Sequence, residues 1–303
     1  MYKCCPQKKK KKNSKRNRNL IIDNGLSTNL TLWIEKSLFH ENVVPEYLIV
    51  IGRNHQSEIS AKSIVSITDC EFFDEYKVLF WEDDNTFDEI SQNSRFSLSV
   101  FVENATLAGN KPWDFSFVGQ AMFNLRTANA LSNVVWLYLV DITMTGMKMS
   151  NEFLKVSCPF ATISGQQWTI TGCEWATGCI DVYNPTQLTI NNLKMSQSRL
   201  SNQGGSSLVS VSSQSIINTG IIFINWQILD CGYLSFTFTN VELFVWNHFT
   251  VKGAKELELE ISTLSMESDY SFVRFDLSDN DYVSFSETHT VQSLSYANTT
   301  MSY

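Results

Sequence analysis

The histidines are the first side chains to consider for chemistry, and all four stand far apart in the sequence: His40, His55, His248 and His289. Only His248 has suggestive neighbours, because it lies in Trp246-Asn-His-Phe249. A winding fold could bring its imidazole near Asp230 or another acid, the kind of pairing that acid–base catalysis needs. Isolated histidines are nevertheless more often packed or solvent-facing than catalytic. No nucleophile elbow, phosphate loop or dinucleotide motif is present, so we predict no catalytic residue.

Four tryptophans, Trp168, Trp175, Trp226 and Trp246, could line a surface that binds sugar. Trp168 and Trp175 fall at inward positions of a strand pattern described below, which favours core packing for them. Trp226 and Trp246 fall off that pattern, so we expect them to be exposed. Exposed aromatic rings on a flat face suit stacking or protein contact. We therefore predict a carbohydrate-contact or partner-contact set of Trp226, Trp246 and His248.

The stretch from Asp69 to Glu89 contains nine carboxylates and could in principle bind calcium. Its densest part, Asp83-Asp84-Asn85, lacks the turn glycine and the distal glutamate of a calcium loop. We interpret the stretch as a solvated hairpin that keeps a sheet edge soluble. No metal site is predicted.

The chain has seven cysteines, an odd number: Cys4, Cys5, Cys70, Cys158, Cys173, Cys179 and Cys231. No Cys-x-x-Cys occurs, and the spacing fits no zinc ligand set. We expect free thiols that behave as small buried hydrophobic residues. Cys173 and Cys179 could pair in an oxidising compartment, a choice that the sequence leaves open. No cofactor is predicted.

Charge is unevenly distributed along the chain. Residues 1–18 hold nine of the 23 basic residues and no acid, so the rest carries a net charge of −17. A body this acidic repels phosphate backbones, which excludes nucleic acid as its partner. The run from Lys8 to Lys12 must stay solvated. Residues 1–19 are read as a disordered arm, an import-like patch, a membrane-surface patch or an extension outside the domain.

Targeting signals do not settle the compartment. The basic start resembles the first part of a secretory signal, but no apolar region follows Asn19-Leu20-Ile21-Ile22-Asp23. No run of 18 apolar residues predicts a transmembrane helix. Membrane association would need the basic tail, with Cys4-Cys5 as acylation sites, or a missing segment. We expect an extracellular or cell-surface location if a signal lies upstream of Met1, and an unknown location otherwise.

Strand chemistry dominates residues 20–295, and only Ala121 to Asn133 looks like a candidate helix. One apolar spacing recurs, with inward positions at i, i+2, i+5 and i+7. Its copies are Val65-Ser-Ile67-Thr-Asp-Cys70-Glu-Phe72, Trp168-Thr-Ile170-Thr-Gly-Cys173-Glu-Trp175, Leu188-Thr-Ile190-Asn-Asn-Leu193-Lys-Met195 and Leu259-Glu-Ile261-Ser-Thr-Leu264-Ser-Met266, with looser copies from Val100 and Leu137. A step of two keeps side chains on one strand face, whereas a step of three requires a bend. The motif therefore describes two short strands joined at a sharp corner.

Further runs of period two separate these motifs, and in the later half they begin about 26 residues apart. That step is in the range of a solenoid coil, here with three short strands per coil stacked through parallel ladders. The predicted fold class is all-β: a right-handed parallel β-helix over residues 20–295, with tails at 1–19 and 296–303.

The corner-strand pairs, Asn191-Asn192 at a bend, and Gln203-Gly-Gly-Ser-Ser-Leu208 resemble the right-handed parallel β-helix of the pectin-lyase-like family over residues 45–295. In style the chain is also similar to β-helix regions of protist surface proteins. A leucine-rich repeat has similar spacing, but four third-anchor residues do not fit it, and helices between strands are missing. A β-sandwich gives the same short alternating strands and stays open.

The resemblance implies enzymes acting on acidic polysaccharides, whose hydrolases carry Asn-Thr-Asp, paired aspartates, Gly-His-Gly and Arg-Ile-Lys. The nearest segment here is Asn218-Thr219-Gly220, which lacks the carboxylate, and Asp83-Asp84 lies in the acidic stretch. We therefore expect a non-catalytic scaffold for surface, adhesion or structural interaction, with protein or carbohydrate as the partner. The alternative is a divergent polysaccharide lyase or glycoside hydrolase.

Overall fold

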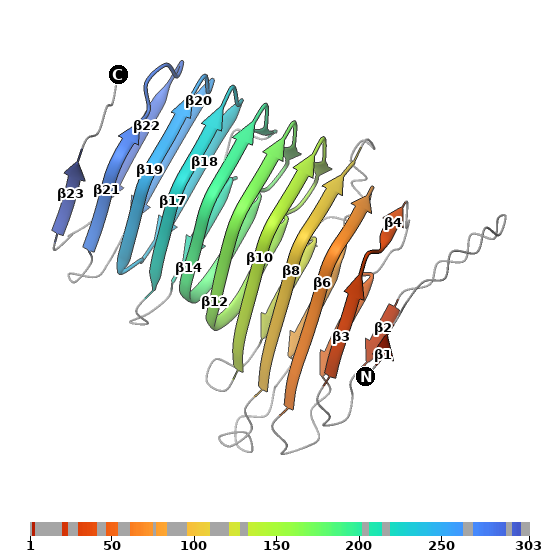
Figure 1. Ribbon diagram of the computed structural model, residues 1–303. Coiled ribbons are helices and arrows are strands. Elements are labelled where there is room, and N and C mark those ends of the chain that lie inside the picture. Colours follow the sequence, from red (N-terminus) through yellow and green to blue (C-terminus); the bar gives the residue numbers. More distant parts are fainter. Residues whose placement is uncertain are drawn as a thin grey trace.

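The computed structural model describes residues 2–3, 20–23, 30–40, 47–53, 61–74, 77–83, 96–109, 121–127, 133–201, 206–213, 219–262, 269–288 and 293–297. These residues form an all-β structure without helices, in which strands far apart in sequence lie side by side (Figure 1). No helix among them is long and apolar enough to cross a membrane. The sequence prediction of an all-β protein is confirmed.

Parallel pairing joins the strands into three ladders. The first contains β1 (Tyr2–Lys3), β3 (Leu30–Glu35), β4 (Leu38–His40), β6 (Ala61–Phe73), β8 (Phe96–Ala108), β10 (Asn133–Thr145), β12 (Leu154–Thr171), β14 (Ile180–Ser196), β17 (Gly220–Leu229), β19 (Leu243–Lys252), β21 (Asp269–Asp276) and β23 (Ser293–Ala297). The second contains β2 (Leu20–Asp23), β5 (Ile49–Arg53), β7 (Leu79–Asp83), β9 (Phe123–Thr127), the starts of β12 and β14, β16 (Val209–Ser212), β18 (Tyr233–Thr239), β20 (Glu256–Ser262) and β22 (Val283–Thr288). The third is short: β11 (Lys148–Met149), β13 (Glu174–Trp175) and β15 (Arg199–Leu200).

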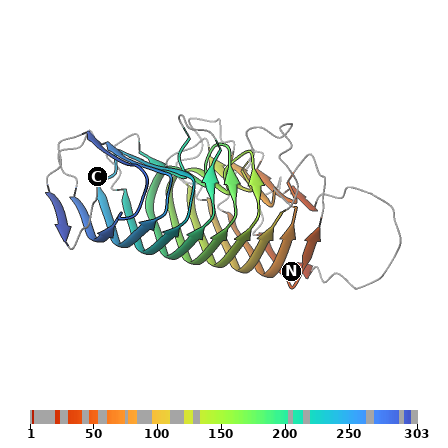
Figure 2. The ribbon, with the colours of Figure 1, turned by 90° about the horizontal axis from the view of Figure 1, so that it is seen from above.

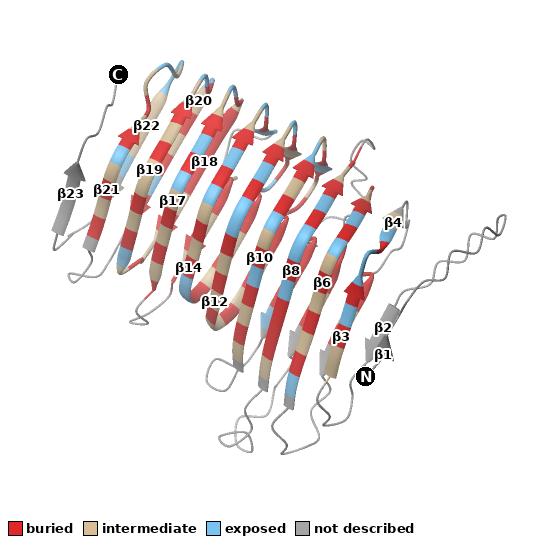
Figure 3. Cartoon of the chain, in the orientation of Figure 1, coloured by how far each residue is buried: buried red, intermediate tan, exposed pale blue. Residues whose placement is uncertain are grey.

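The chain alternates between the first and second ladders, so each coil adds one strand to both. We call each coil a rung of the stack, and the stack is β-helix-like (Figure 2). Buried and exposed residues alternate along the strands, as Figure 3 shows on β8 and β10. Inward apolar side chains of successive rungs stack into one continuous core. Burying an apolar side chain contributes roughly 1.5–3 kcal/mol, so this shared core is the main source of stability.

A bend with positive φ divides each long strand of the first ladder. The residues at this corner, one per rung, have φ between 47° and 59°: Lys36, Asp69, Asn104, Asp141, Gln167, Asn192, Asn225, His248 and Arg274. This left-handed backbone lets both halves of the strand point inward across a step of three residues. The corner predicted from the apolar spacing is confirmed, and we call these nine residues the corner ladder.

Polar side chains link neighbouring rungs of the corner ladder. The amide of Asn104 donates to Asp69 Oδ1 over 2.7 Å, although 35 residues separate them. Asn225 donates in the same way to Asn192, and Arg274 contacts His248. Asparagine and aspartate tolerate left-handed backbone better than most residues, so the corner selects them and then pairs their side chains.

Two expectations about the elements are wrong. The candidate helix at Ala121–Asn133 contains β9 instead, because Phe123 and Leu125 point into the core at strand spacing. The acidic stretch is not a hairpin in its described part, since β6 and β7 belong to different ladders.

Two other motif copies lie elsewhere in the coil than at the corner ladder. Trp168 to Trp175 spans a different corner, at Gly172, which has a φ of 64°. The copy from Leu259 begins on β20, in the second ladder, and its part beyond Ser262 lies outside the described residues.

The predicted tails fall largely outside the described residues. Residues 4–19 and 298–303 are not described, whereas Tyr2–Lys3 form β1 and Tyr296–Ala297 belong to β23. The proposed domain limits therefore stay predictions.

Candidate binding surface

An outward aromatic row crosses the first strands of the first ladder. Trp33, Phe101 and Tyr138 occupy one register row, with Ser66 between Trp33 and Phe101. Their side chains are 37%, 40% and 37% exposed, among the few large hydrophobic residues on the described surface. We call Trp33, Ser66, Phe101 and Tyr138 the aromatic row. It is the clearest candidate surface for binding.

The rings of Phe101 and Tyr138 lie face to face. Their centroids are 5.1 Å apart and their planes differ by only 3°. Parallel rings can lie either edge to edge in one plane or face to face. Edge to edge they would clash at this centroid distance, so the two rings are stacked face to face. The pair therefore presents ring edges, rather than ring faces, to solvent. Stacking of a flat sugar on this pair would need the covered faces, which makes the geometry a poor carbohydrate platform.

Ser66 creates a gap in the aromatic row. Neighbouring parallel strands lie roughly 4.8 Å apart, so the strands that carry Trp33 and Phe101 are about 9.6 Å apart. The floor of this gap carries the small Ser66 hydroxyl, which lies 3.5 Å from the Thr68 hydroxyl. We call this position of the row, where a small residue stands between Trp33 and Phe101, the notch.

A second outward row extends the apolar surface. Ile64, Ser99 and Trp136 are register neighbours on β6, β8 and β10. Ser99 is buried although it points outward between the two larger side chains. The two rows together give this part of the sheet an apolar character over four neighbouring strands.

A different row, on the second ladder, is polar. Asn124, Lys155, Asp181 and Ser210 are register neighbours on consecutive rungs. Lys155 Nζ lies 2.9 Å from Asp181 Oδ2. Burial lowers the pKa of Lys155, but the hydrogen bond with Asp181 and the charge of Glu152 outweigh it, so the net pKa is raised. A lysine with a raised pKa stays protonated and can hold an anion, but it cannot abstract a proton.

Tyr47 anchors the buried side of this region. Its hydroxyl donates to the Ala121 carbonyl over 2.7 Å, and the Asn124 amide donates to the same hydroxyl over 3.3 Å. Burial raises the pKa of Tyr47 to about 12, so the hydroxyl stays neutral. The network is fully engaged in holding the strands, which is a structural role.

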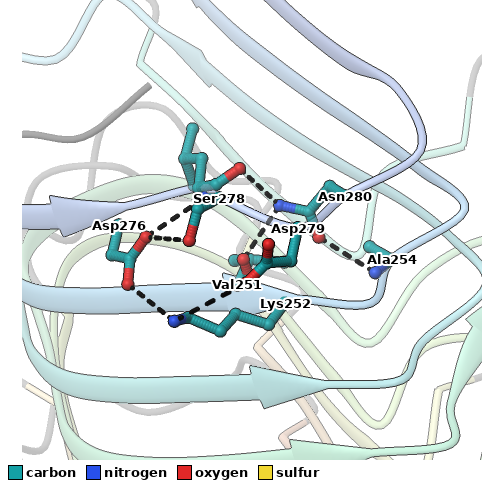
Figure 4. A network of polar contacts seen from close by, with 8 residues as sticks. Val251, Lys252, Ala254, Asp276, Ser278, Asp279 and Asn280 are labelled. Atoms are coloured by element: carbon teal, nitrogen blue, oxygen red, sulfur yellow. Dashed lines mark hydrogen bonds and ion pairs between the residues drawn. The ribbon is translucent and has the colours of Figure 1, made fainter. Parts of the chain in front are cut away.

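Two acidic side chains near the C-terminal end are paired with a lysine of the same cluster (Figure 4). Lys252 Nζ lies 3.1 Å from Asp276 and 3.9 Å from Asp279. Ser278 donates to Asp276 from both its backbone nitrogen and its hydroxyl, and Asn280 bridges Val251, Leu277 and Ala254. The described residues contain no group of three or more metal-ligating side chains.

The exposure expected for Trp226 and Trp246 is wrong. They are 1% and 0% exposed and pack against Phe223 and Phe249 in the densest aromatic part of the core. Trp226 Nε1 donates to the Ile190 carbonyl over 2.9 Å. Both indoles occupy inward anchors of the corner motif, so neither can contact a ligand at the surface.

The two indoles were misassigned because Ile222, Ile224 and Val245 fill outward positions where the strict pattern required polar residues. Core packing of Trp168 and Trp175 is confirmed, since both are fully buried.

His248 lies on the corner ladder with φ of 59°, beside Arg274 of the next rung. Its Nε2 contacts this guanidinium and its Nδ1 has no hydrogen-bond partner, so His248 pairs with neither Asp230 nor another acid among the described residues. A contact role for His248 stays a prediction.

The cysteine prediction is confirmed for the described residues. Cys70, Cys158, Cys173, Cys179 and Cys231 are all buried thiols that form no disulfide, and Cys173 and Cys179 are not bonded to each other. Burial raises the pKa of Cys173 and Cys231 to about 11, which suppresses the reactive thiolate.

The aromatic row was missed by sequence reasoning, although a signal exists. Each of its aromatic residues stands between the first two inward anchors of a corner motif, as Phe101 does between Val100 and Val102. An aromatic residue at that outward position has no core to enter and must face solvent.

Comparisons with known proteins add nothing to this geometry: no protein-family model, no curated protein and no solved structure matches the chain.

Proposed function

We propose that this protein is a non-catalytic interaction scaffold, built as a right-handed parallel β-helix of the pectin-lyase-like kind, that docks a protein partner on the aromatic row. The observation that carries the proposal is the row itself: three exposed aromatic side chains in one register on a regular sheet, with the small Ser66 between two of them. Exposed aromatic residues on a rigid surface are typical anchors of protein interfaces.

The proposed partner is a protein rather than a carbohydrate. Edge-on rings, and a small residue between Trp33 and Phe101 on strands about 9.6 Å apart, suit an apolar side chain inserted between the two rings. The flanking row of Ile64 and Trp136 enlarges the apolar contact beyond one residue. A partner segment with one large apolar anchor, surrounded by smaller contacts, fits this surface best.

The proposal includes a location at the cell surface or outside the cell. It rests on similarity in style to β-helix regions of surface proteins, and on a rigid sheet that suits adhesion. Extending the reading frame upstream and testing that longer product for export is the direct check. A product retained in the cytoplasm would remove the location without affecting the docking surface.

Filling the notch tests the docking role. Ser66→Phe completes the aromatic row without touching the core, so we expect stability to be kept and partner binding to be lost. Ser66→Thr is the matched control and should bind. Proteins retained by immobilised wild type and lost by S66F would be purified, and their Kd would be measured for each variant. Equal affinity of purified partners for wild type, S66F and S66T would refute the proposal.

The second candidate function is a carbohydrate-active enzyme acting on acidic polysaccharide. It is favoured by the polar row, in which Asn124, Lys155 and Asp181 stand on consecutive rungs. A screen against pectins and related uronates, with and without calcium, distinguishes the two. Turnover that is lost in Lys155→Ala and kept in Ser66→Phe would replace the scaffold proposal.

A further inference from the structure

The two ends of the strand stack are its incompletely covered parts. Four apolar side chains pack against the core while staying partly exposed: Leu30 and Phe39 at one end, Val283 and Phe285 at the other. The contrast with the preceding rung is sharp, because Leu257 and Leu259, the register neighbours of Val283 and Phe285, are 1% and 3% exposed. Each end therefore leaves apolar side chains of the core partly exposed.

The strands at the two ends belong to the same two ladders. At the N-terminal end, β1 pairs with β3 and β2 pairs with β5. At the C-terminal end, β23 pairs with β21 and β22 pairs with β20. Among the described residues, nothing pairs with the outer sides of these four end strands. Figures 1 and 2 place the two ends at opposite extremes of the stack, with all strands of each ladder running in one direction.

The charges of the two ends are opposite. Among the described residues up to Lys62, four are basic and two are acidic, a net charge of +2. Among the described residues from Glu256 to Ala297, eight are acidic and one, Arg274, is basic, a net charge of −7. Charges of opposite sign steer association and oppose contact between two C-terminal ends.

We propose that a second copy of this chain docks head to tail, with the C-terminal end of one copy against the N-terminal end of the next. Strand β23 of one copy then lies beside β1 of the next, and β22 beside β2, so both parallel ladders continue across the junction. Val283 and Phe285 are covered by the apolar end around Leu30 and Phe39. Because the contact joins two different surfaces, it repeats without closing and produces linear assemblies.

Sedimentation of the full chain over roughly a hundredfold range of concentration tests this proposal. The expected result is a mass that rises with concentration beyond the dimer and falls in about 1 M salt, where charge attraction is screened. Phe285→Lys places a charge at the exposed end of the core and should weaken association by about tenfold or more. Glu260→Lys, on the rung before the C-terminal end, should weaken it without altering the core.

Matched variants decide the other outcomes. Glu103→Lys makes the same change on an exposed residue of β8, an interior strand that is paired on both sides, and should leave association unchanged. If F285K does not fold, as circular dichroism would show, Glu260→Lys against Glu103→Lys still decides the question. A chain that stays monomeric at every concentration overturns the proposal. So does a closed dimer that Phe101→Ser abolishes and Glu260→Lys does not, because that dimer uses the aromatic row.

Discussion

The side-chain amide of Asn225 donates a hydrogen bond to Oδ1 of Asn192 over 3.0 Å, and both residues have positive φ at the corners of neighbouring rungs. They are 33 residues apart in the chain. One residue type thus meets two demands at once: a backbone conformation that most side chains resist, and a polar partner one rung away.

Replacing Asn225 separates these two contributions. Asn225→Ala loses the hydrogen bond to Asn192. Its Cβ also strains the positive-φ backbone, and alanine has no polar side chain to compensate for that strain, so we expect destabilisation of about 2 kcal/mol. Asn225→Gly loses the same hydrogen bond but accepts positive φ freely, and should cost about 1 kcal/mol. Urea unfolding measures both. Alanine as stable as glycine at this position would show that the corner conformation carries no strain.

The buried indole of Trp226 gives a test of the core assignment. Trp226→Ala removes a fully buried ring and should destabilise the protein by roughly 3–5 kcal/mol. Trp226→Phe keeps most of the volume but loses the hydrogen bond from the indole to the Ile190 carbonyl, so a smaller loss of about 1–3 kcal/mol is expected. A surface role for this residue, as the sequence first indicated, would leave the stability of both variants close to wild type.

The five buried thiols predict a step in chemical reactivity. Titration of the native protein with a thiol reagent should leave Cys70, Cys158, Cys173, Cys179 and Cys231 unreacted. Unfolding in denaturant should expose five additional thiols together. Reaction of Cys173 or Cys231 in the folded protein, located by mass spectrometry of the modified peptides, would contradict their burial.

The raised pKa values of Cys173 and Cys231 predict alkaline sensitivity. Their pKa is about 11 in the folded protein against an ordinary value of 9.0, because burial disfavours the thiolate. The folded state holds these protons longer than the unfolded state, so the stability they contribute is complete below pH 9 and declines between pH 9 and 11. Thermal melts of wild type and of the double variant Cys173→Ala, Cys231→Ala, recorded at each pH, compare how steeply the melting temperature falls between pH 9 and 11. We expect a shallower fall in the variant. A variant with the same slope as wild type across that range would refute the assignment.

Asp276 predicts the opposite dependence, in acid. The hydrogen bond from the Ser278 hydroxyl, with further help from Lys252, lowers the pKa of Asp276 below its ordinary value of 3.8. The stability from this carboxylate is therefore present above that pH and is lost as the pH falls through the folded pKa. Asp276→Asn should show a shallower loss of stability in acid than wild type, measured by urea unfolding at each pH. An identical acid profile would mean that the network in Figure 4 does not persist in solution.

Much of the fold could be predicted from the sequence, because inward anchors leave a strong apolar spacing. Val65, Ile67, Cys70 and Phe72 show the corner clearly, since the residues between them are polar. The coils containing Trp226 and Trp246 were missed because their outward residues are also apolar. Binary patterning fails wherever both faces of a strand are hydrophobic.

The candidate site was harder to predict, because it depends on register between distant segments. Nothing in the local sequence shows that Trp33, Phe101 and Tyr138 fall into one row, since coils of unequal length separate them. Only the parallel pairing of β3, β6, β8 and β10 brings them together. Register of this kind follows from the complete stack rather than from any single motif.

The central claim is that the chain stacks rung upon rung in one parallel register, and distances between spin labels test it most directly. Ser66, Ser164 and Ser271 lie in one outward row, three and then four rungs apart. With Cys4 and Cys5 replaced by serine, labels at cysteines introduced in pairs at these sites should give backbone separations of about 14, 19 and 34 Å. The account predicts that the two shorter distances add up to the longest one. A Ser66–Ser271 distance shorter than either of the others would place the two segments side by side and contradict the stack.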